Sequence, residues 1–228
     1  MTDTVLEMIK DQSTTSHRGR LDALRLYLIT DRTLLPEGQF MAGIEAALKG
    51  GVRAIQLREK ELPENELRAL AQDVLKLTQK YNALLFINHR AELAHDLGVD
   101  GVHLTESSTA VRKVRAQYPD LWIGKSTHSL QSAKRAQHQG ADFVTFSPVY
   151  DTPSKQHYGA PQGLEKLKQV CAGVDIPVLA LGGIELSRIT PVRKHGAFGV
   201  ALIRAIWNSP DIEHESLKYI NALTGETQ

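Results

Sequence analysis

Short apolar runs alternate with longer amphipathic segments from Leu26 to near the end of the chain. In the longer segments apolar residues recur at three- and four-residue steps, as in Phe40, Ile44, Ala47 and Leu48, which is typical of one buried helix face. The short runs have the length and composition of buried strands. They predict eight strands, at residues 26–30, 54–57, 84–88, 101–104, 122–126, 143–147, 177–181 and 199–203.

This alternation predicts a parallel sheet built from βα units, and eight units in about 200 residues suit a closed barrel. An open doubly wound sheet is the alternative, but it usually carries a glycine-rich turn after its first strand. Here the first strand runs into Asp31-Arg32, and no such turn follows. We therefore expect an α/β fold, a single (β/α)8 TIM barrel over residues 21–228. Several of its helices should end at a glycine before the next strand: Gly50, Gly98, Gly140 and Gly196.

The composition of the chain indicates which kinds of ligand or partner it favours. The chain of 228 residues has a formal net charge of +1, so no overall field favours nucleic acid or an anionic membrane. It lacks a secretory signal and any apolar run of about 20 residues, so we expect a cytoplasmic protein with a small-molecule ligand. Cys171 is the only cysteine, which excludes a disulfide framework. Residues 1–20 are predicted to form a flexible N-terminal extension, and a homo-oligomer is compatible with the sequence.

Polar and apolar residues alternate across residues 54–60. On a strand this alternation places Gln56, Arg58 and Lys60 on one face and the apolar residues on the other. In a barrel covered by helices the polar face looks inward, where three such groups are costly to bury without a partner. Two cations beside an amide therefore predict a binding site for phosphate or pyrophosphate. Surface ion pairs with the neighbouring glutamates are the alternative.

Two other segments on the same edge of the sheet suit an anion. Gly182-Gly183 follows the seventh predicted strand and precedes a helix, so its backbone amides can approach a phosphate, although a simple turn needing positive φ is the alternative. The loop at residues 147–163 is the longest connection on this face, and it predicts a lid or clamp. It offers two hydroxyls and an ammonium to an anion, on Thr152, Ser154 and Lys155.

A histidine and an amide complete the candidate site. His128 follows the fifth predicted strand, beside Ser126, where it can act as an acid or a base, although a capping or packing role is the alternative. Asn88 ends the third strand on the same edge and can bind a ligand. His103 lies inside the fourth strand, and we expect its role to be structural.

These motifs occur in a fixed order along the chain: Tyr27-Leu28-Ile29-Thr30-Asp31, Gln56-Leu57-Arg58-Glu59-Lys60, Ile87-Asn88, Asp100-Gly101-Val102-His103-Leu104, residues 124–128, Gly140-Ala141-Asp142, residues 152–155, Gly182-Gly183-Ile184 and residues 196–206. As a set, over about residues 25–210, they resemble the thiamin phosphate synthase and thiazole tautomerase superfamily. The resemblance implies the same barrel and a small phosphorylated heterocycle as ligand.

The resemblance also implies roles for single residues. In the synthases the side chains that match Gln56, Arg58 and Lys60 hold the pyrophosphate of an aminopyrimidine. Asn88, Ser126 and Lys155 match further substrate-binding residues of the family. The phosphate of the second substrate, a thiazole, would lie at Thr152, Gly183, Ile203 and Arg204. Arg204 replaces a typical serine, so it is expected either to strengthen phosphate binding or to crowd the phosphate.

Two departures from the synthase pattern concern magnesium. The synthases hold Mg²⁺ with two aspartates, and this chain has His89 and Ser108 at those positions. Magnesium prefers carboxylate oxygens, so a histidine and a serine are poor substitutes, although Glu106 lies nearby in the sequence.

The departures favour the tautomerase branch of the superfamily. The resemblance implies that a tautomerase aromatises a carboxylated thiazole phosphate by proton transfer, with a histidine that matches His128 and without a metal. We therefore expect an isomerase without a cofactor. The first alternative is a magnesium-dependent thiamin phosphate synthase, which joins hydroxymethylpyrimidine pyrophosphate to thiazole phosphate and which the intact Gln56–Lys60 motif favours. The second is a noncatalytic barrel that binds a thiamin precursor.

Overall fold

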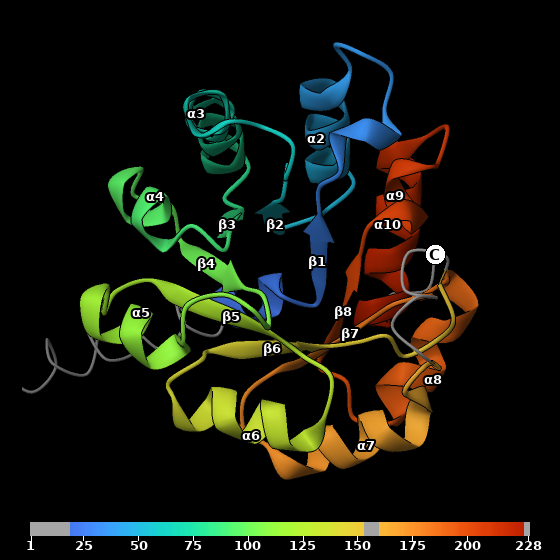
Figure 1. Cartoon of the computed structure of the whole chain (residues 1–228). Coiled ribbons are helices and arrows are strands. Elements are labelled where there is room, and N and C mark those ends of the chain that lie inside the picture. The colour runs from blue at the N-terminus through green and yellow to red at the C-terminus, as the bar shows by residue number, and fades with distance from the viewer. Residues whose placement is uncertain (1–18, 153–159, 226–228) are drawn as a thin grey trace, which may run out of the picture.

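The computed structural model describes residues 19–152 and 160–225. Eight parallel strands close into a barrel in chain order, and β8 pairs with β1 (Figure 1). All eight lie within one residue of their predicted bounds, so the TIM-barrel prediction is confirmed. The strands are β1 (Leu26–Ile29), β2 (Ala54–Leu57), β3 (Leu84–Asn88), β4 (Gly101–Leu104), β5 (Trp122–Thr127), β6 (Phe143–Phe146), β7 (Val178–Leu181) and β8 (Gly199–Leu202).

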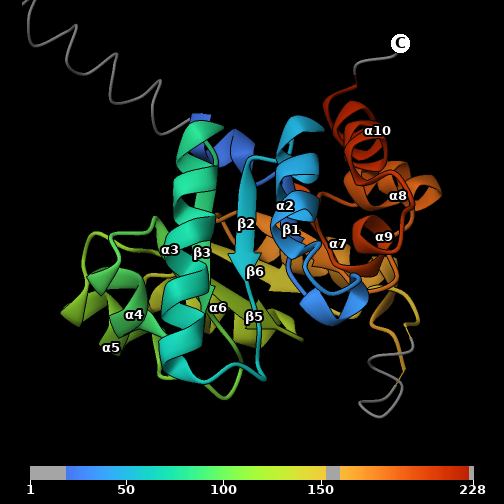
Figure 2. The same cartoon turned by 90° about the horizontal axis from the view of Figure 1, so that it is seen from above.

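Helices follow the strands and form the outer layer of the barrel, as Figures 1 and 2 show from two directions. None of the helices in the described part of the chain is long and apolar enough to cross a membrane. The α-helices are α2 (Phe40–Lys49), α3 (Glu64–Lys80), α4 (Ala91–Asp96), α5 (Val111–Gln117), α6 (Leu130–His138), α7 (Gly163–Gly173), α8 (Ile189–Lys194), α9 (Arg204–Trp207) and α10 (Ile212–Thr224); two 3-10 helices are η1 (Arg32–Leu34) and η3 (Leu186–Arg188).

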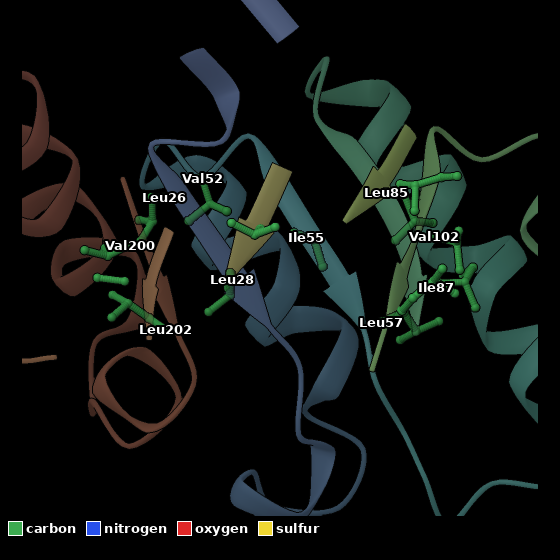
Figure 3. Close-up of a cluster of buried hydrophobic side chains, with 14 of the residues drawn as sticks. Leu26, Leu28, Val52, Ile55, Leu57, Leu85, Ile87, Val102, Val200 and Leu202 are labelled. Atoms are coloured by element: carbon green, nitrogen blue, oxygen red, sulfur yellow. The ribbon is translucent and has the colours of Figure 1, made fainter. Parts of the chain in front are cut away.

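The alternation of side chains along the strands divides the core into two parts. Outward-facing strand residues such as Leu28, Ile55 and Val102 are fully buried against the helices (Figure 3). The inward-facing part contains Tyr27 and other aromatic rings, and it fills the middle of the barrel. Because the interior is packed with side chains, a ligand site is expected at one mouth of the barrel.

The aromatic rings of the interior pack edge to face. The ring centroid of Tyr27 lies 5.4 Å from that of Phe86 and 5.3 Å from that of Phe143, at interplanar angles of 78° and 74°. Edge-to-face contacts of this kind add to the free energy of burying the rings. All three rings are fully buried, so they form a rigid floor for the residues nearer the mouth.

The N-terminal end of the barrel contains a cavity of about 580 Å³, which Arg53 and Arg193 help to line. Both arginines bond to the protein backbone and so stabilise the fold. Arg53 donates hydrogen bonds to the carbonyl oxygens of Leu48 (2.7 Å) and Val52 (2.8 Å). Arg193 donates to the carbonyl oxygen of Leu223, near the end of α10. Cations stabilise the carbonyl ends of helices, so these arginines secure the ends of α2 and α10. The candidate residues that the structure describes lie at the other end.

The start of the described chain contacts the barrel. Arg20 forms an ion pair with Asp100 (2.9 Å), and its guanidinium lies 5.3 Å from the centroid of the Trp122 ring. Residues 1–18, which make up most of the predicted N-terminal extension, lie outside the described residues.

Candidate active site

The C-terminal ends of β2 and β3 bring two buried amides together. Nε2 of Gln56 donates to Oδ1 of Asn88 (3.0 Å), and Nδ2 of Asn88 donates to Nδ1 of His89 (2.8 Å). Gln56 is 2% exposed, and its Oε1 is buried without a hydrogen-bond partner in the part of the chain that the structure describes. A buried carbonyl oxygen without a donor is costly, so this atom is suited to accept a hydrogen bond from a ligand or a water molecule.

A hydroxyl and a buried carboxylate fix the backbone around Arg58. The N–H of Arg58 donates to Oγ1 of Thr30 (2.9 Å), and that hydroxyl donates to Oε1 of Glu59. Oε2 of Glu59 accepts from the N–H of Arg32 (2.9 Å). Burial raises the pKa of Glu59, while the hydrogen bonds from Thr30 and Arg32 oppose this rise. The network joins the ends of β1 and β2, and the sequence pattern did not predict it.

The strand pattern predicted for residues 54–60 holds only in part. β2 ends at Leu57, Arg58 is partly buried, Glu59 is buried, and Lys60 is exposed. The prediction that Lys60 lies on the inner strand face is therefore wrong, because Glu59 turns back to meet Thr30 and ends the strand geometry. The alternative of surface ion pairs with the neighbouring glutamates is wrong for Glu59, because this carboxylate is buried and pairs with Thr30.

The mouth is nevertheless positively charged. Burial lowers the pKa of His89, and the nearby charges of Arg90, Lys60 and Arg58 lower it further. The charge of Arg58 also helps to lower the pKa of the interior His103. Arg58 and Lys60 thus contribute positive charge to this mouth of the barrel, although Arg58 is only partly buried and Lys60 is exposed.

His103 forms the polar floor of the site, in agreement with its predicted structural role. Nε2 of His103 lies 3.1 Å from Oγ of Ser126, and Nδ1 lies 3.4 Å from the Tyr27 hydroxyl. Burial, followed by the charges of Lys125 and Arg58, lowers the pKa of His103 to about 3. The imidazole is therefore neutral at pH 7 and holds the Ser126 hydroxyl in place.

Acid should destabilise the protein through His103. A group whose pKa falls from 6.5 when unfolded to about 3 when folded contributes stability above pH 6.5 that is lost as the pH falls toward 3. Between pH 7 and pH 5 the wild type should lose about 2 kcal/mol more unfolding free energy than His103→Gln, measured by urea denaturation. The exposed His138→Gln variant should match the wild type, and equal pH dependence in all three proteins would contradict the prediction.

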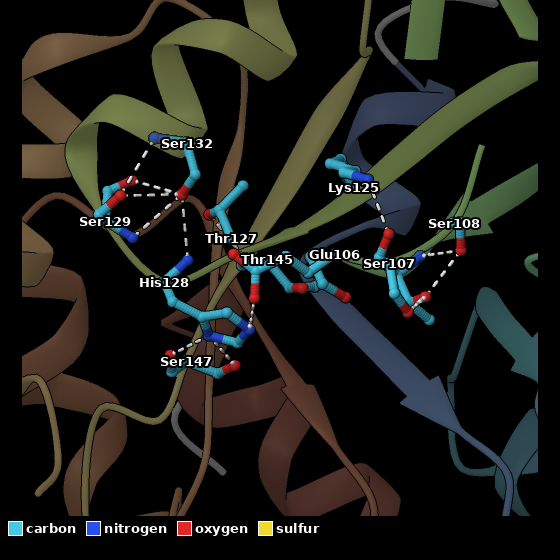
Figure 4. A network of polar contacts seen from close by, with 12 residues as sticks. Glu106, Ser107, Ser108, Lys125, Thr127, His128, Ser129, Ser132, Thr145 and Ser147 are labelled. Atoms are coloured by element: carbon cyan, nitrogen blue, oxygen red, sulfur yellow. Dashed lines mark hydrogen bonds and ion pairs between the residues drawn. The ribbon is translucent and has the colours of Figure 1, made fainter. Parts of the chain in front are cut away.

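His128 lies between two acceptors at the ends of β4 and β6 (Figure 4). Its Nδ1–H donates to the carbonyl oxygen of Ser147 (2.6 Å), which fixes the ring. Nε2 lies 3.5 Å from Oε2 of Glu106, a largely exposed carboxylate. Ser129 caps α6 in a reciprocal pair with Ser132. The ring is thus oriented by the protein, with Nε2 directed toward Glu106.

The turn after β7 offers backbone amides to an anion. Gly182 and Gly183 have φ of +99° and +63°, the left-handed region that glycine adopts without strain. Within the described chain, the N–H groups of Gly183 and Ile184 donate to no acceptor. Such amides in a glycine turn suit a phosphate.

The other residues predicted to bind the thiazole phosphate follow β6 and β8, the strands on either side of β7. Ile203 and Arg204 begin α9 directly after β8, the neighbouring strand, and Arg204 is exposed. Thr152 lies in the loop after β6. Ser154 and Lys155, the predicted clamp, lie outside the described residues.

The chain matches a known family over most of its length. The family model described as thiamine monophosphate synthase matches residues 26–206. The chain belongs to this family. Its members act on small phosphorylated heterocycles, the ligand class expected from the motifs.

Several proteins similar to this chain are named as synthases. A protein of Aquifex aeolicus named putative thiamine-phosphate synthase 2 is 48% identical over 78% of this chain and 94% of its own. The thiamine-phosphate synthase of Pyrococcus horikoshii is 36% identical over 84% of this chain and 91% of its own. Among solved structures, thiamine phosphate pyrophosphorylase from Pyrococcus furiosus superposes with a TM-score of 0.83 at 33% identity, covering 90% of this chain and 98% of that one.

These matches contradict the preference for a tautomerase. The preference rested on the absence of two magnesium carboxylates and the presence of His128, which are features of single side chains. Similarity over the whole barrel places the chain among proteins named as synthases. The oriented histidine has a structural explanation, since it links the end of β5 to the end of β6 through Ser147.

The residues at the family's two magnesium positions do not fit the ion. Nδ1 of His89 accepts from Asn88, and Oγ of Ser108 already contacts the N–H (2.9 Å) and hydroxyl (2.7 Å) of Thr105. Within residues 19–152 and 160–225 no group of three histidine, cysteine, aspartate or glutamate residues could hold a metal. Glu106, the carboxylate near these positions in the sequence, lies beside His128. The donor set therefore lacks the hard oxygens that Mg²⁺ prefers.

Proposed function

We propose that this protein is a transferase that joins hydroxymethylpyrimidine pyrophosphate to thiazole phosphate, with thiamin phosphate and pyrophosphate as products. In this reaction the C–O bond to pyrophosphate breaks, and the thiazole nitrogen forms a C–N bond to the same carbon. The observation that carries the proposal is the pair of anion sites at one mouth. Arg58 and Lys60 supply cations beside β2, and beside β7 the Gly183 and Ile184 amides have no acceptor among the described residues.

The β2 side suits the pyrimidine pyrophosphate. Gln56 and Asn88 are held side by side, and the unsatisfied Oε1 of Gln56 can accept a hydrogen bond from the substrate. Arg58 and Lys60 then oppose the negative charge that grows on the leaving pyrophosphate. Because the side chains at the family's magnesium positions do not fit that ion, these two cations bear a larger share of this charge. The Ser126 hydroxyl, oriented by His103, contributes a further polar contact.

The β7 side suits the phosphate of the thiazole. The turn at Gly183 presents its amides, and Thr152 with Arg204 is expected to complete the phosphate site. Two substrates held by separate anion sites gain the advantage of proximity, since each phosphate orients one reacting ring. Ser154 and Lys155 keep their predicted role as anion-binding residues of the loop after β6, and His128 keeps its predicted role as an acid or base.

A two-substrate assay tests the proposal. The purified full chain is supplied with hydroxymethylpyrimidine pyrophosphate and thiazole phosphate in magnesium chloride, and thiamin phosphate and pyrophosphate are measured. We expect both products in equal amounts. The rate of the His128→Asn variant in the same assay measures how much that residue contributes to turnover. Binding of both compounds without any product would contradict the proposal and indicate a noncatalytic barrel.

A further inference from the structure

The turn after β7 packs directly on the loop after β6. The N–H of Tyr150 donates to the carbonyl oxygen of Gly182 (3.0 Å), which extends the pairing beyond the two strands. A Cβ atom added to Gly183 would lie 2.5 Å from the carbonyl oxygen of Asp151 and 2.8 Å from Cβ of Tyr150. The position of the turn therefore depends on the position of this loop.

Arg188 joins the two segments from the end of η3. Its NH1 donates to the carbonyl oxygen of Gly183 (2.5 Å), and its guanidinium carbon lies 4.5 Å from the centroid of the Tyr150 ring. The second contact is a cation–π interaction, and a planar guanidinium can make both contacts at once. Oε1 of Glu185 lies 3.8 Å from NH1, which partly offsets the charge of Arg188.

The hydrogen bond from Arg188 controls the direction of an amide. The carbonyl of Gly183 and the N–H of Ile184 belong to one planar trans peptide, so they point in opposite directions. Holding the carbonyl therefore fixes where the N–H of Ile184 points. Ile184 is 4% exposed, and its N–H has no acceptor within the described chain. A buried unpaired N–H is costly unless a ligand or water accepts from it.

We propose that Arg188 is a positioning residue that holds the Gly183–Ile184 peptide and Tyr150 in the arrangement that binds the phosphate of the thiazole substrate. Arg188 acts on the phosphate through the peptide that it orients. This assignment deepens the proposed function and rests on it for the identity of the ligand. It concerns one of the two anion sites, so it predicts an effect on one substrate only.

Two substitutions in the full chain test this assignment. Arg188→Met removes both contacts, and Arg188→Lys keeps the charge but loses the planar group that makes both contacts. Both variants should raise KM for thiazole phosphate about tenfold, with KM for the pyrimidine pyrophosphate and kcat within about twofold of the wild type. Recovery of wild-type KM in Arg188→Lys would overturn the assignment, since charge alone would then suffice. Equal increases in both KM values would overturn it as well.

Calorimetric titration with thiazole phosphate separates this proposal from the transferase activity. Binding is measured without turnover, so a weaker affinity in the Arg188 variants supports the positioning role even if no thiamin phosphate forms. Arg112→Met, on the exposed face of α5, is the matched control and should bind like the wild type. Tyr150→Leu should weaken binding to a similar extent, and Arg188→Met combined with Tyr150→Leu should be no weaker than the weaker single variant. Additive losses would overturn the proposal.

Discussion

Arg58→Met is expected to lower kcat/KM for hydroxymethylpyrimidine pyrophosphate by about a hundredfold to a thousandfold. The physical reason is that the guanidinium meets charge that develops on the leaving pyrophosphate, at a mouth where the metal carboxylates are replaced by His89 and Ser108. Steady-state kinetics with the pyrimidine substrate varied and thiazole phosphate saturating measure this effect. Most of the loss should fall on kcat, because the interaction strengthens as the C–O bond breaks.

A matched arginine distinguishes this effect from a general loss of charge. Arg68 lies on α3 and pairs with Asp96 at an exposed site (3.0 Å). Exposed pairs contribute at most about 1 kcal/mol to stability, so Arg68→Met should keep kcat/KM within about twofold of the wild type. A comparable loss in both variants, or no loss in Arg58→Met, would contradict the role given to Arg58.

Gly183→Ala should raise KM for thiazole phosphate by about a hundredfold, because a displacement of about 1 Å at a binding site costs that much. The new Cβ would lie 2.5 Å from a carbonyl oxygen, and Gly183 has φ of +63°, so the turn must move away from the loop. Titration calorimetry and steady-state kinetics should both show the loss, while KM for the pyrimidine pyrophosphate stays near its wild-type value.

Gly98 supplies the control for backbone strain. Its φ of +64° matches that of Gly183, but nothing lies within 4 Å of an added Cβ. Gly98→Ala should therefore cost about 1 kcal/mol of stability without changing either KM. Thermal unfolding of both variants separates the two effects. If Gly98→Ala weakened phosphate binding as strongly, strain rather than the contact with the loop would be responsible.

The strands could be predicted because their signal is local. Short apolar runs located all eight, since each strand must be buried on both of its faces in a closed barrel. The ligand class was predictable for a related reason. The motifs that carry it lie at the ends of these strands, and the barrel brings all strand ends to one mouth.

The reaction was harder to predict than the ligand class. The replacement of two carboxylates by His89 and Ser108 predicts a poor magnesium site, but it did not identify the reaction. One oriented histidine can serve acid–base chemistry or can join two loops. The similarity of most of the chain to proteins named as synthases overturned the inference drawn from these few side chains.

The sequence by itself determined the number, order and burial of the strands, and therefore the barrel and the mouth at which polar residues gather. Only the tertiary structure decided which polar groups meet: Glu59 turns inward to Thr30 while Lys60 remains exposed, and Arg188 joins Gly183 to Tyr150. Strand patterns depend on neighbours one or two residues apart, whereas these contacts join segments about 30 residues apart or more. Their geometry is set by how the loops pack after the barrel has closed.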